Sequence, residues 1–189
     1  MTFLLTPFRT VLQAVLIVFA MGTFPALAAS SVELDRLFDQ LAKAQSPAEA
    51  ALIEDEIWRQ WSDSGSPTLD LIMLRGLKAL EAQEYAVALD MFSTAIEIEP
   101  DYAEAWNKRA TLYYVINDYD AAIADVTQVL AREPRHWAAL MGLAVMFDDL
   151  DRKEPALGAY RAAFEINPQL EDAEAAIERL KVDVEGRGI

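Results

Sequence analysis

The sequence predicts an all-α protein, a solenoid of antiparallel helix hairpins with capping helices at its N- and C-terminal ends. Three observations predict this fold class. Pro100, Pro134 and Pro168 recur at a spacing of 34 residues. Small and large apolar residues recur in the same columns between these prolines. Hydrophobic residues make up 53% of the 189-residue chain, which is enough to build a packed core.

The first segment, residues 1–28, is predicted to be a secretory signal peptide. Arg9 is its only charged side chain, an apolar run follows, and residues 26–28 form an A-x-A site of small residues. The apolar run is shorter than the ~20 residues that a membrane-spanning helix needs. We therefore expect cleavage after Ala28 and export to the periplasm. The alternative is an uncleaved leader that anchors the protein in the inner membrane.

The next segment, residues 29–68, is predicted to be an N-terminal helical hairpin. Serine followed three residues later by glutamate, at Ser30 and Glu33 and again at Ser46 and Glu49, is typical of a capping box at a helix start. The hairpin is either a cap or a degenerate fourth repeat. The apolar positions of its two helices are Leu34, Leu37, Phe38 and Leu41, then Ile53, Ile57 and Trp61.

Three repeats are predicted in residues 69–168, as units 69–102, 103–136 and 137–170. Small residues in matching columns allow two antiparallel helices to approach closely, and a larger residue there would overpack the contact. Proline lacks the N–H that a helix interior needs, so we expect it to end the second helix of each unit. The matching columns are Gly76, Ala110 and Ala144; Ala88, Ala122 and Ala156; Phe92, Val126 and Tyr160; and Ala95, Val129 and Ala163.

These columns resemble those of the tetratricopeptide repeat family, whose unit reads W-x2-L-G-x2-Y, then A-x3-F, then P. The second repeat carries Trp106 and Tyr113, and the first carries Gly76, Ala88 and Phe92. The resemblance covers about half of the chain. It implies a helix–turn–helix unit and a superhelix whose concave face is formed by the first helix of each repeat.

The last segment, residues 171–189, is predicted to be a C-terminal capping helix followed by a tail. Repeat arrays need a polar outer face on their last element, and acidic and basic residues flank the apolar stripe here. The stripe consists of Leu170, Ala173, Ile177, Leu180 and Val184.

The composition excludes several classes of partner and site. A formal net charge of −15 argues against nucleic acid and against an anionic membrane surface, because both require basic patches. The chain has no cysteine, so it forms no disulfide, no thiolate metal site and no cysteine nucleophile. A homo-oligomer stays open as an alternative, although no feature of the sequence supports one.

Aromatic and imidazole side chains offer few candidates for chemistry. His136, the single histidine, lies between Pro134 and Trp137, and we expect it to be an exposed turn residue. One histidine without other strong ligands does not make a zinc site. Trp58 and Trp61 lie three residues apart on one helix, where a sugar-stacking pair is one interpretation and the core of the cap is the favoured one.

Acidic residues cluster at two predicted helix junctions, Asp118 with Asp120 and Asp148 with Asp149 and Asp151. Neither cluster has the spacing of a calcium-binding loop. We interpret them as helix caps. The sequence therefore predicts no metal, no cofactor and no enzymatic activity.

The resemblance implies a concave groove as the binding surface. Some family members hold a C-terminal carboxylate there with lysine, arginine and asparagine, but this chain has Met73, Leu77, Ala138 and Gly142 at such positions. A largely apolar groove suits an amphipathic helix or an extended peptide. The alternative is that several of these side chains pack against neighbouring helices. The implied groove residues are Met73, Leu77, Leu80, Asn107, Thr111, Tyr114, Met141, Val145 and Asp148.

The function implied by the resemblance is that of a periplasmic scaffold or adaptor that binds a protein or peptide of the cell envelope. The alternatives are an accessory or sensor subunit of an envelope enzyme with a cryptic site, or a membrane-anchored assembly factor if the leader is retained.

Overall fold

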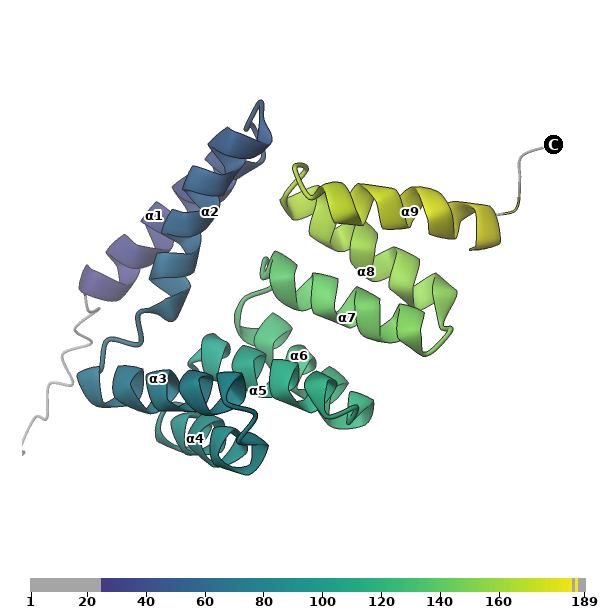
Figure 1. Ribbon diagram of the computed structural model, residues 1–189. Helices are drawn as coiled ribbons and strands as arrows, with labels where there is room; N and C mark the ends of the chain where they lie inside the picture. The colour runs from purple at the N-terminus through teal and green to yellow at the C-terminus, as the bar shows by residue number, and fades with distance from the viewer. Residues whose placement is uncertain (1–24, 185, 187–189) are drawn as a thin grey trace, which may run out of the picture.

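The structure, a computed structural model, describes residues 25–184 and 186. Within these residues it consists of nine α-helices and contains no strand (Figure 1). The all-helical prediction is therefore confirmed. The helices are α1 (Pro25–Leu41), α2 (Pro47–Ser62), α3 (Pro67–Glu81), α4 (Tyr85–Ile98), α5 (Ala103–Val115), α6 (Tyr119–Arg132), α7 (Trp137–Asp149), α8 (Lys153–Ile166) and α9 (Glu171–Val184).

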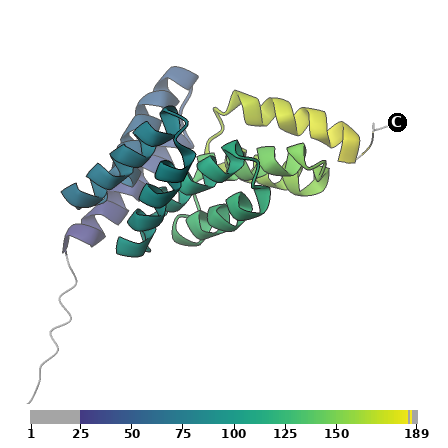
Figure 2. The ribbon, with the colours of Figure 1, turned by 60° about the horizontal axis from the view of Figure 1, so that its bottom comes forward.

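Six of the helices form three antiparallel hairpins that stack in chain order: α3 with α4, α5 with α6, and α7 with α8. Each hairpin also contacts the next one, through α4 with α5 and α6 with α7, and α9 packs on α8. Figures 1 and 2 show the resulting array from two directions. The first helices of the repeats touch one another, α3 with α5 and α5 with α7, and so form one continuous row.

The small-residue columns lie where the helices of a hairpin approach most closely. A Cβ atom added to Gly76 would lie 2.5 Å from Cε1 of Phe92, well inside van der Waals contact. Ala88, Ala122 and Ala156, which share a column in the second helices, are fully buried. The periodic spacing thus predicted the packing inside each repeat correctly.

The turns inside the repeats share one geometry. Gln83, Asn117 and Asp151, which are spaced 34 residues apart, all have a left-handed backbone with φ of 61°, 61° and 53°. The amide that follows each of them donates to a carbonyl of the preceding helix, for example Asp118 N to Tyr113 O at 2.8 Å. This pattern ends the first helix and satisfies carbonyls that would otherwise lack a partner.

The predicted helix ends agree with the structure in most places. Ser46 accepts a hydrogen bond from Glu49 N at 3.2 Å and so caps α2 as predicted. Glu49 accepts from Gln45 N at 2.9 Å, one residue before the N-cap, so the capping box forms with its second bond displaced by one residue. The capping box predicted at Ser30 and Glu33 is wrong, because α1 continues through both positions. Glu33 instead pairs with Arg36.

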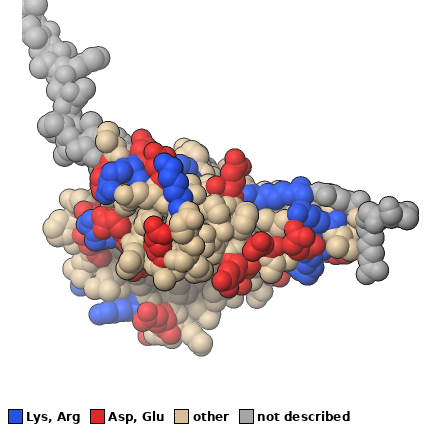
Figure 3. Space-filling view, turned by 90° about the horizontal axis from the view of Figure 1, so that it is seen from above, with Lys and Arg blue, Asp and Glu red and all other residues tan. Residues whose placement is uncertain are grey.

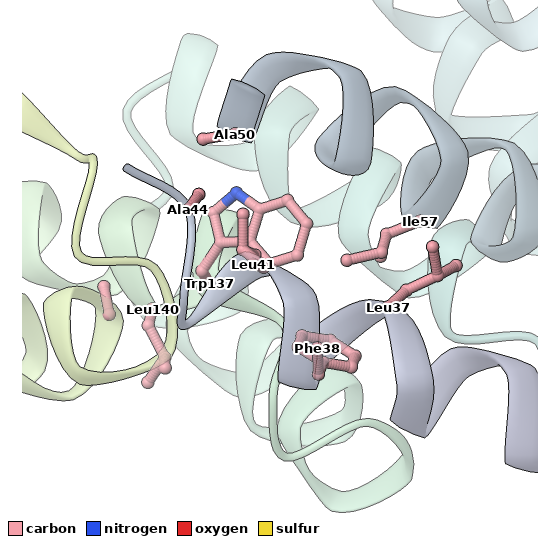
Figure 4. Close-up of a cluster of buried hydrophobic side chains, with 9 residues drawn as sticks. Leu37, Phe38, Leu41, Ala44, Ala50, Ile57, Trp137 and Leu140 are labelled. Atoms are coloured by element: carbon pink, nitrogen blue, oxygen red, sulfur yellow. The ribbon is translucent and has the colours of Figure 1, made fainter. Parts of the chain in front are cut away.

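The N-terminal hairpin, defined as α1 and α2, packs across the array onto the third repeat. Trp137 and Leu140 of α7 enter one buried cluster with side chains of α1 and α2 (Figure 4). At the far end of the hairpin, Gln169 Nε2 donates to Ala44 O at 3.1 Å, beside the turn between α8 and α9. The hairpin therefore bridges the first and the last parts of the chain. Its buried residues are Leu37, Phe38, Leu41, Ala44, Ala50 and Ile57.

The predicted signal peptide falls mostly on residues 1–24, outside the described residues. Among the described helices, none combines the length and the apolar character required to cross a bilayer.

Candidate functional site

The row of first helices places the nine implied groove residues in different surroundings. Asn107, Thr111, Tyr114 and Val145 come together and line one pocket. Met73 and Leu77 line a second hollow of about 170 Å³, between α2, α3 and α5. Leu80 and Met141 pack against hydrophobic clusters, and Asp148 pairs with Arg179 of α9.

The pocket between α5 and α7, here called the α5–α7 pocket, has a volume of about 210 Å³. Small residues of α7 make room for it, because a Cβ atom added to Gly142 would meet nothing within 4 Å. No charged residue lines it. The lining residues are Asn107, Ala110, Thr111, Tyr114, Val126, Ala138, Ala139, Gly142, Val145 and Met146.

Two tyrosines and one aspartate mark one end of the pocket. The hydroxyl of Tyr114 donates to Asp149 Oδ2 at 3.0 Å, and the hydroxyl of Tyr119 reaches the same oxygen at 3.4 Å. The hydrogen bond to the carboxylate raises the pKa of Tyr114 above its ordinary value. Tyr114 therefore remains a neutral hydrogen-bond donor to the Asp149 carboxylate beside the pocket.

The N-terminal hairpin covers the N-terminal ends of α5 and α7, which lie opposite to the ends that carry Tyr114 and Asp149. The ring of Trp61 stacks on the imidazole of His136, with centroids 4.1 Å apart and planes 8° from parallel. Trp58 meets the same imidazole edge-on, and Lys108 lies over the Trp58 ring at 5.2 Å. The favoured interpretation of Trp58 and Trp61 as core residues is thus confirmed, since both pack against the buried cluster.

The prediction that His136 is an exposed turn residue is wrong: it is 0% exposed. The N-terminal hairpin covers the turn that holds it. His136 also caps α7, because Ala139 N donates to its Nδ1 at 3.1 Å. The remaining ring nitrogen, Nε2, then carries the proton and donates to Glu104 Oε1 at 3.3 Å.

Glu104 is the centre of a buried polar network that the sequence analysis missed. Besides His136, it accepts from Asn107 Nδ2 at 3.1 Å and pairs with Lys108 Nζ at 3.3 Å. Burial raises the pKa of Glu104, but these hydrogen bonds and the Lys108 charge outweigh burial and hold the pKa below its ordinary value. The spacing of Glu104 and Lys108 on one helix face was readable from the sequence. The contact with His136 was not.

Asn107 is one of the implied groove residues. Its amide nitrogen is already used by Glu104, and the residue is only 9% exposed. Its carbonyl oxygen Oδ1 is a hydrogen-bond acceptor on a side chain that lines the α5–α7 pocket.

The interpretation of the acidic clusters as helix caps is confirmed for Asp118 and is wrong for the second cluster, because Asp148 and Asp149 lie in the last turn of α7 and the N-terminus of α8 has no side-chain cap. Asp118 accepts from Ala121 N at 3.2 Å and caps α6. Asp148 pairs with Arg179, and Asp151 lies 3.8 Å from Lys153. Among the described residues, no group of three acidic or histidine side chains is arranged to hold a metal ion.

Stacked antiparallel hairpins with a row of first helices define a class, the helical-repeat solenoids. The sequence profile of the tetratricopeptide repeat matches residues 73–126 and 107–171. A TPR repeat-containing protein of Rhizobium etli is 38% identical over 153 residues, which cover 81% of this chain and 75% of the relative. The chain belongs to the tetratricopeptide repeat family.

Solved structures agree with this assignment. The Sgt2 TPR domain from Aspergillus fumigatus superposes with a TM-score of 0.58 at 23% identity, over 64% of this chain and 81% of that domain. The first TPR of Spaghetti (RPAP3), bound to an HSP90 peptide, gives a TM-score of 0.58 at 17% identity over 62% of this chain and 93% of that one. At these identities the likeness concerns the fold.

Proposed function

We propose that this protein is a non-enzymatic adaptor of the periplasm that holds a segment of another protein in the α5–α7 pocket. The observation that carries the proposal is the pocket itself, an uncharged hollow on the row of first helices, bordered by small residues of α7. The repeat domain of Spaghetti (RPAP3) with its HSP90 peptide supports a peptide as the kind of ligand. The leader-like residues 1–28 support export.

The pocket is tested by filling it. Gly142→Leu places a side chain into the open space of the pocket, whereas Gly158→Leu, a matched control, adds one on the exposed side of α8. A photo-crosslinking residue at Thr111, which is exposed and lines the pocket, then reports what binds in cells. We expect crosslinked protein partners in the wild type and the control and at least about a tenfold loss in Gly142→Leu, as for occlusion of a central binding contact. Equal crosslinking in all three proteins would refute the pocket as the binding site.

Export is tested separately by fractionating cells and sequencing the N-terminus of the mature protein. We expect a periplasmic protein that begins at Ala29. An intact Met1 in the membrane fraction would favour the anchored alternative.

A further inference from the structure

We infer that the α5–α7 pocket selects a polypeptide segment with one large apolar side chain and a lysine or arginine within about three residues of it. The apolar side chain enters the pocket and the cation pairs with Asp149. This inference rests on the proposed function, which it deepens by stating the chemistry of the partner.

The pocket fits one apolar side chain. Its floor is formed by the buried side chains of Ala110, Val126, Ala139 and Met146. A buried cavity of about 150 Å³ with an apolar lining is sufficient to bind benzene. The volume of about 210 Å³ therefore accommodates an aliphatic or aromatic side chain, and the uncharged lining disfavours a charged one.

Asp149 is the charge that remains available at the edge of this pocket. It lies one helical turn beyond Val145 on α7 and is exposed. The neighbouring aspartates have cationic partners: Asp148 pairs with Arg179, and Asp151 pairs with Lys153. Within the described residues Asp149 is hydrogen-bonded only by the neutral hydroxyls of Tyr114 and Tyr119. Its carboxylate is thus held in place and its charge is not neutralised.

The backbone of the segment has a partner as well. The acceptor Oδ1 belongs to Asn107, which lies two turns before Tyr114 on α5 and lines the pocket. A helix rises 1.5 Å per residue, so about 10 Å separates the two residues along α5. An extended chain covers this distance in about three residues. An amide that donates to Asn107 Oδ1 and a cation at Asp149 therefore bracket the apolar side chain, which sets the spacing within the segment.

The charge of the whole molecule favours the same partner. The net charge of −15 repels acidic peptides and accelerates the encounter with basic ones. On the face seen in Figure 3, acidic and basic side chains are interspersed among uncharged ones. The selectivity for a cation is assigned to Asp149, whose carboxylate lies at the edge of the pocket and accepts from Tyr114 and Tyr119.

The test uses random short peptides displayed on phage, selected on the full chain and counter-selected on Gly142→Leu. We expect the enriched peptides to share a large apolar residue with Lys or Arg within about three positions. The inference would be overturned if the enriched peptides were acidic or lacked a cation. It would also be overturned if every enriched peptide bound Gly142→Leu as well as it binds the wild type. The crosslinking at Thr111 judges the proposed function independently, because it makes no assumption about the chemistry of the partner.

A double-mutant cycle then locates the cation. The affinity of one selected peptide, and of the same peptide with its cation replaced by glutamine, is measured for wild type, Asp149→Asn and the control Asp90→Asn. Asp90 is an exposed aspartate on α4, so the control changes the net charge equally. We expect Asp149→Asn to weaken the cationic peptide about two- to fivefold and to leave the glutamine peptide unchanged. Equal effects of Asp149→Asn and Asp90→Asn would place the cation elsewhere and refute the pairing.

Discussion

At the scale of single residues, two glycines on first helices serve opposite purposes. Gly76 faces the fully buried ring of Phe92, so its lack of a side chain allows α3 and α4 to approach. Gly142 faces open space, so its lack of a side chain creates part of the α5–α7 pocket. The same residue type supports packing in one repeat and a binding surface in another.

The two glycines should respond oppositely to alanine. Gly76→Ala forces a contact with the buried Phe92 ring, and we expect it to lower the free energy of unfolding by about 1–3 kcal/mol. Gly142→Ala meets no neighbour and replaces glycine within a helix, so we expect a gain of about 0.5–1 kcal/mol. Urea unfolding of both variants measures the difference. A Gly76→Ala protein as stable as the wild type would show that α3 and α4 are not held so closely.

The network around Glu104 predicts how stability depends on pH. The pKa of Glu104 is lowered in the folded protein, so its ionised form contributes stability above the ordinary value of 4.5, and this contribution is lost as the pH falls through the lowered pKa. We expect Glu104→Gln to cost about 1–3 kcal/mol at pH 7 and to flatten the fall of stability in acid. Urea unfolding at a series of pH values measures both effects.

The control for this variant is Glu97→Gln, since Glu97 is exposed on α4. We expect it to change stability by less than about 0.5 kcal/mol and to leave the pH dependence as it is in the wild type. If Glu104→Gln behaves like this control, the carboxylate of Glu104 is not paired in solution.

Sequence reasoning succeeded at residues whose neighbours are in the same repeat and failed at residues whose neighbours are distant. Ala122 and Phe92 were placed correctly because their contacts recur with the repeat. His136 was misplaced because its cover comes from Trp61, which belongs to another element far away in the sequence. The same cause hid Glu104, whose burial depends on this cover.

At the scale of elements, the N-terminal hairpin is the unit that the repeat pattern did not place. Its amphipathic helices were predicted from their apolar spacing, yet that spacing does not say which surface they cover. Specific contacts fix the position of the hairpin on the array. Arg135 Nη1 pairs with Asp35 of α1 at 2.8 Å, and the Arg135 guanidinium lies 4.1 Å from the centroid of the Phe38 ring. Asn167 donates to Glu54 of α2 at 2.5 Å.

The tryptophans of α2 should dominate the docking of this hairpin. Trp61 is partly buried, so we expect Trp61→Ala to cost about 3 kcal/mol, the low end of the range for tryptophan-to-alanine changes. The change removes the stack on His136 and contacts with Trp137. Leu52→Ala on the same helix, where leucine is 74% exposed, should cost less than about 0.5 kcal/mol. Hydrogen exchange in Trp61→Ala should accelerate throughout α1 and α2. Retained protection there would mean that other contacts hold the hairpin.

At the scale of the whole molecule, the N-terminal hairpin changes how the array is connected. In a simple repeat array each unit contacts only its neighbours, so parts of it can unfold separately. Here α1 and α2 precede the first repeat in the chain and pack on the third, which couples units that are not adjacent.

This coupling predicts cooperative unfolding. We expect the wild type to unfold in one calorimetric transition whose van't Hoff enthalpy equals the calorimetric enthalpy. The double variant Trp58→Ala with Trp61→Ala should broaden or divide the transition, because it weakens the link between the hairpin and α7. Two transitions in the wild type itself would show that the docked hairpin does not couple the repeats.

The short connection between α2 and α3, residues 63–66, tethers the N-terminal hairpin to the repeat array. The hairpin therefore occupies the surface of the array on which it packs as an intramolecular binding partner. A short flexible tether gives a local concentration of about millimolar, which any molecule competing for the same surface must exceed through its own abundance or affinity. A segment that enters only the α5–α7 pocket meets no such competitor. Dilute, weakly binding partners are therefore confined to the pocket, and only a strong or abundant one gains access to the ends of α5 and α7 beneath Trp58 and Trp61.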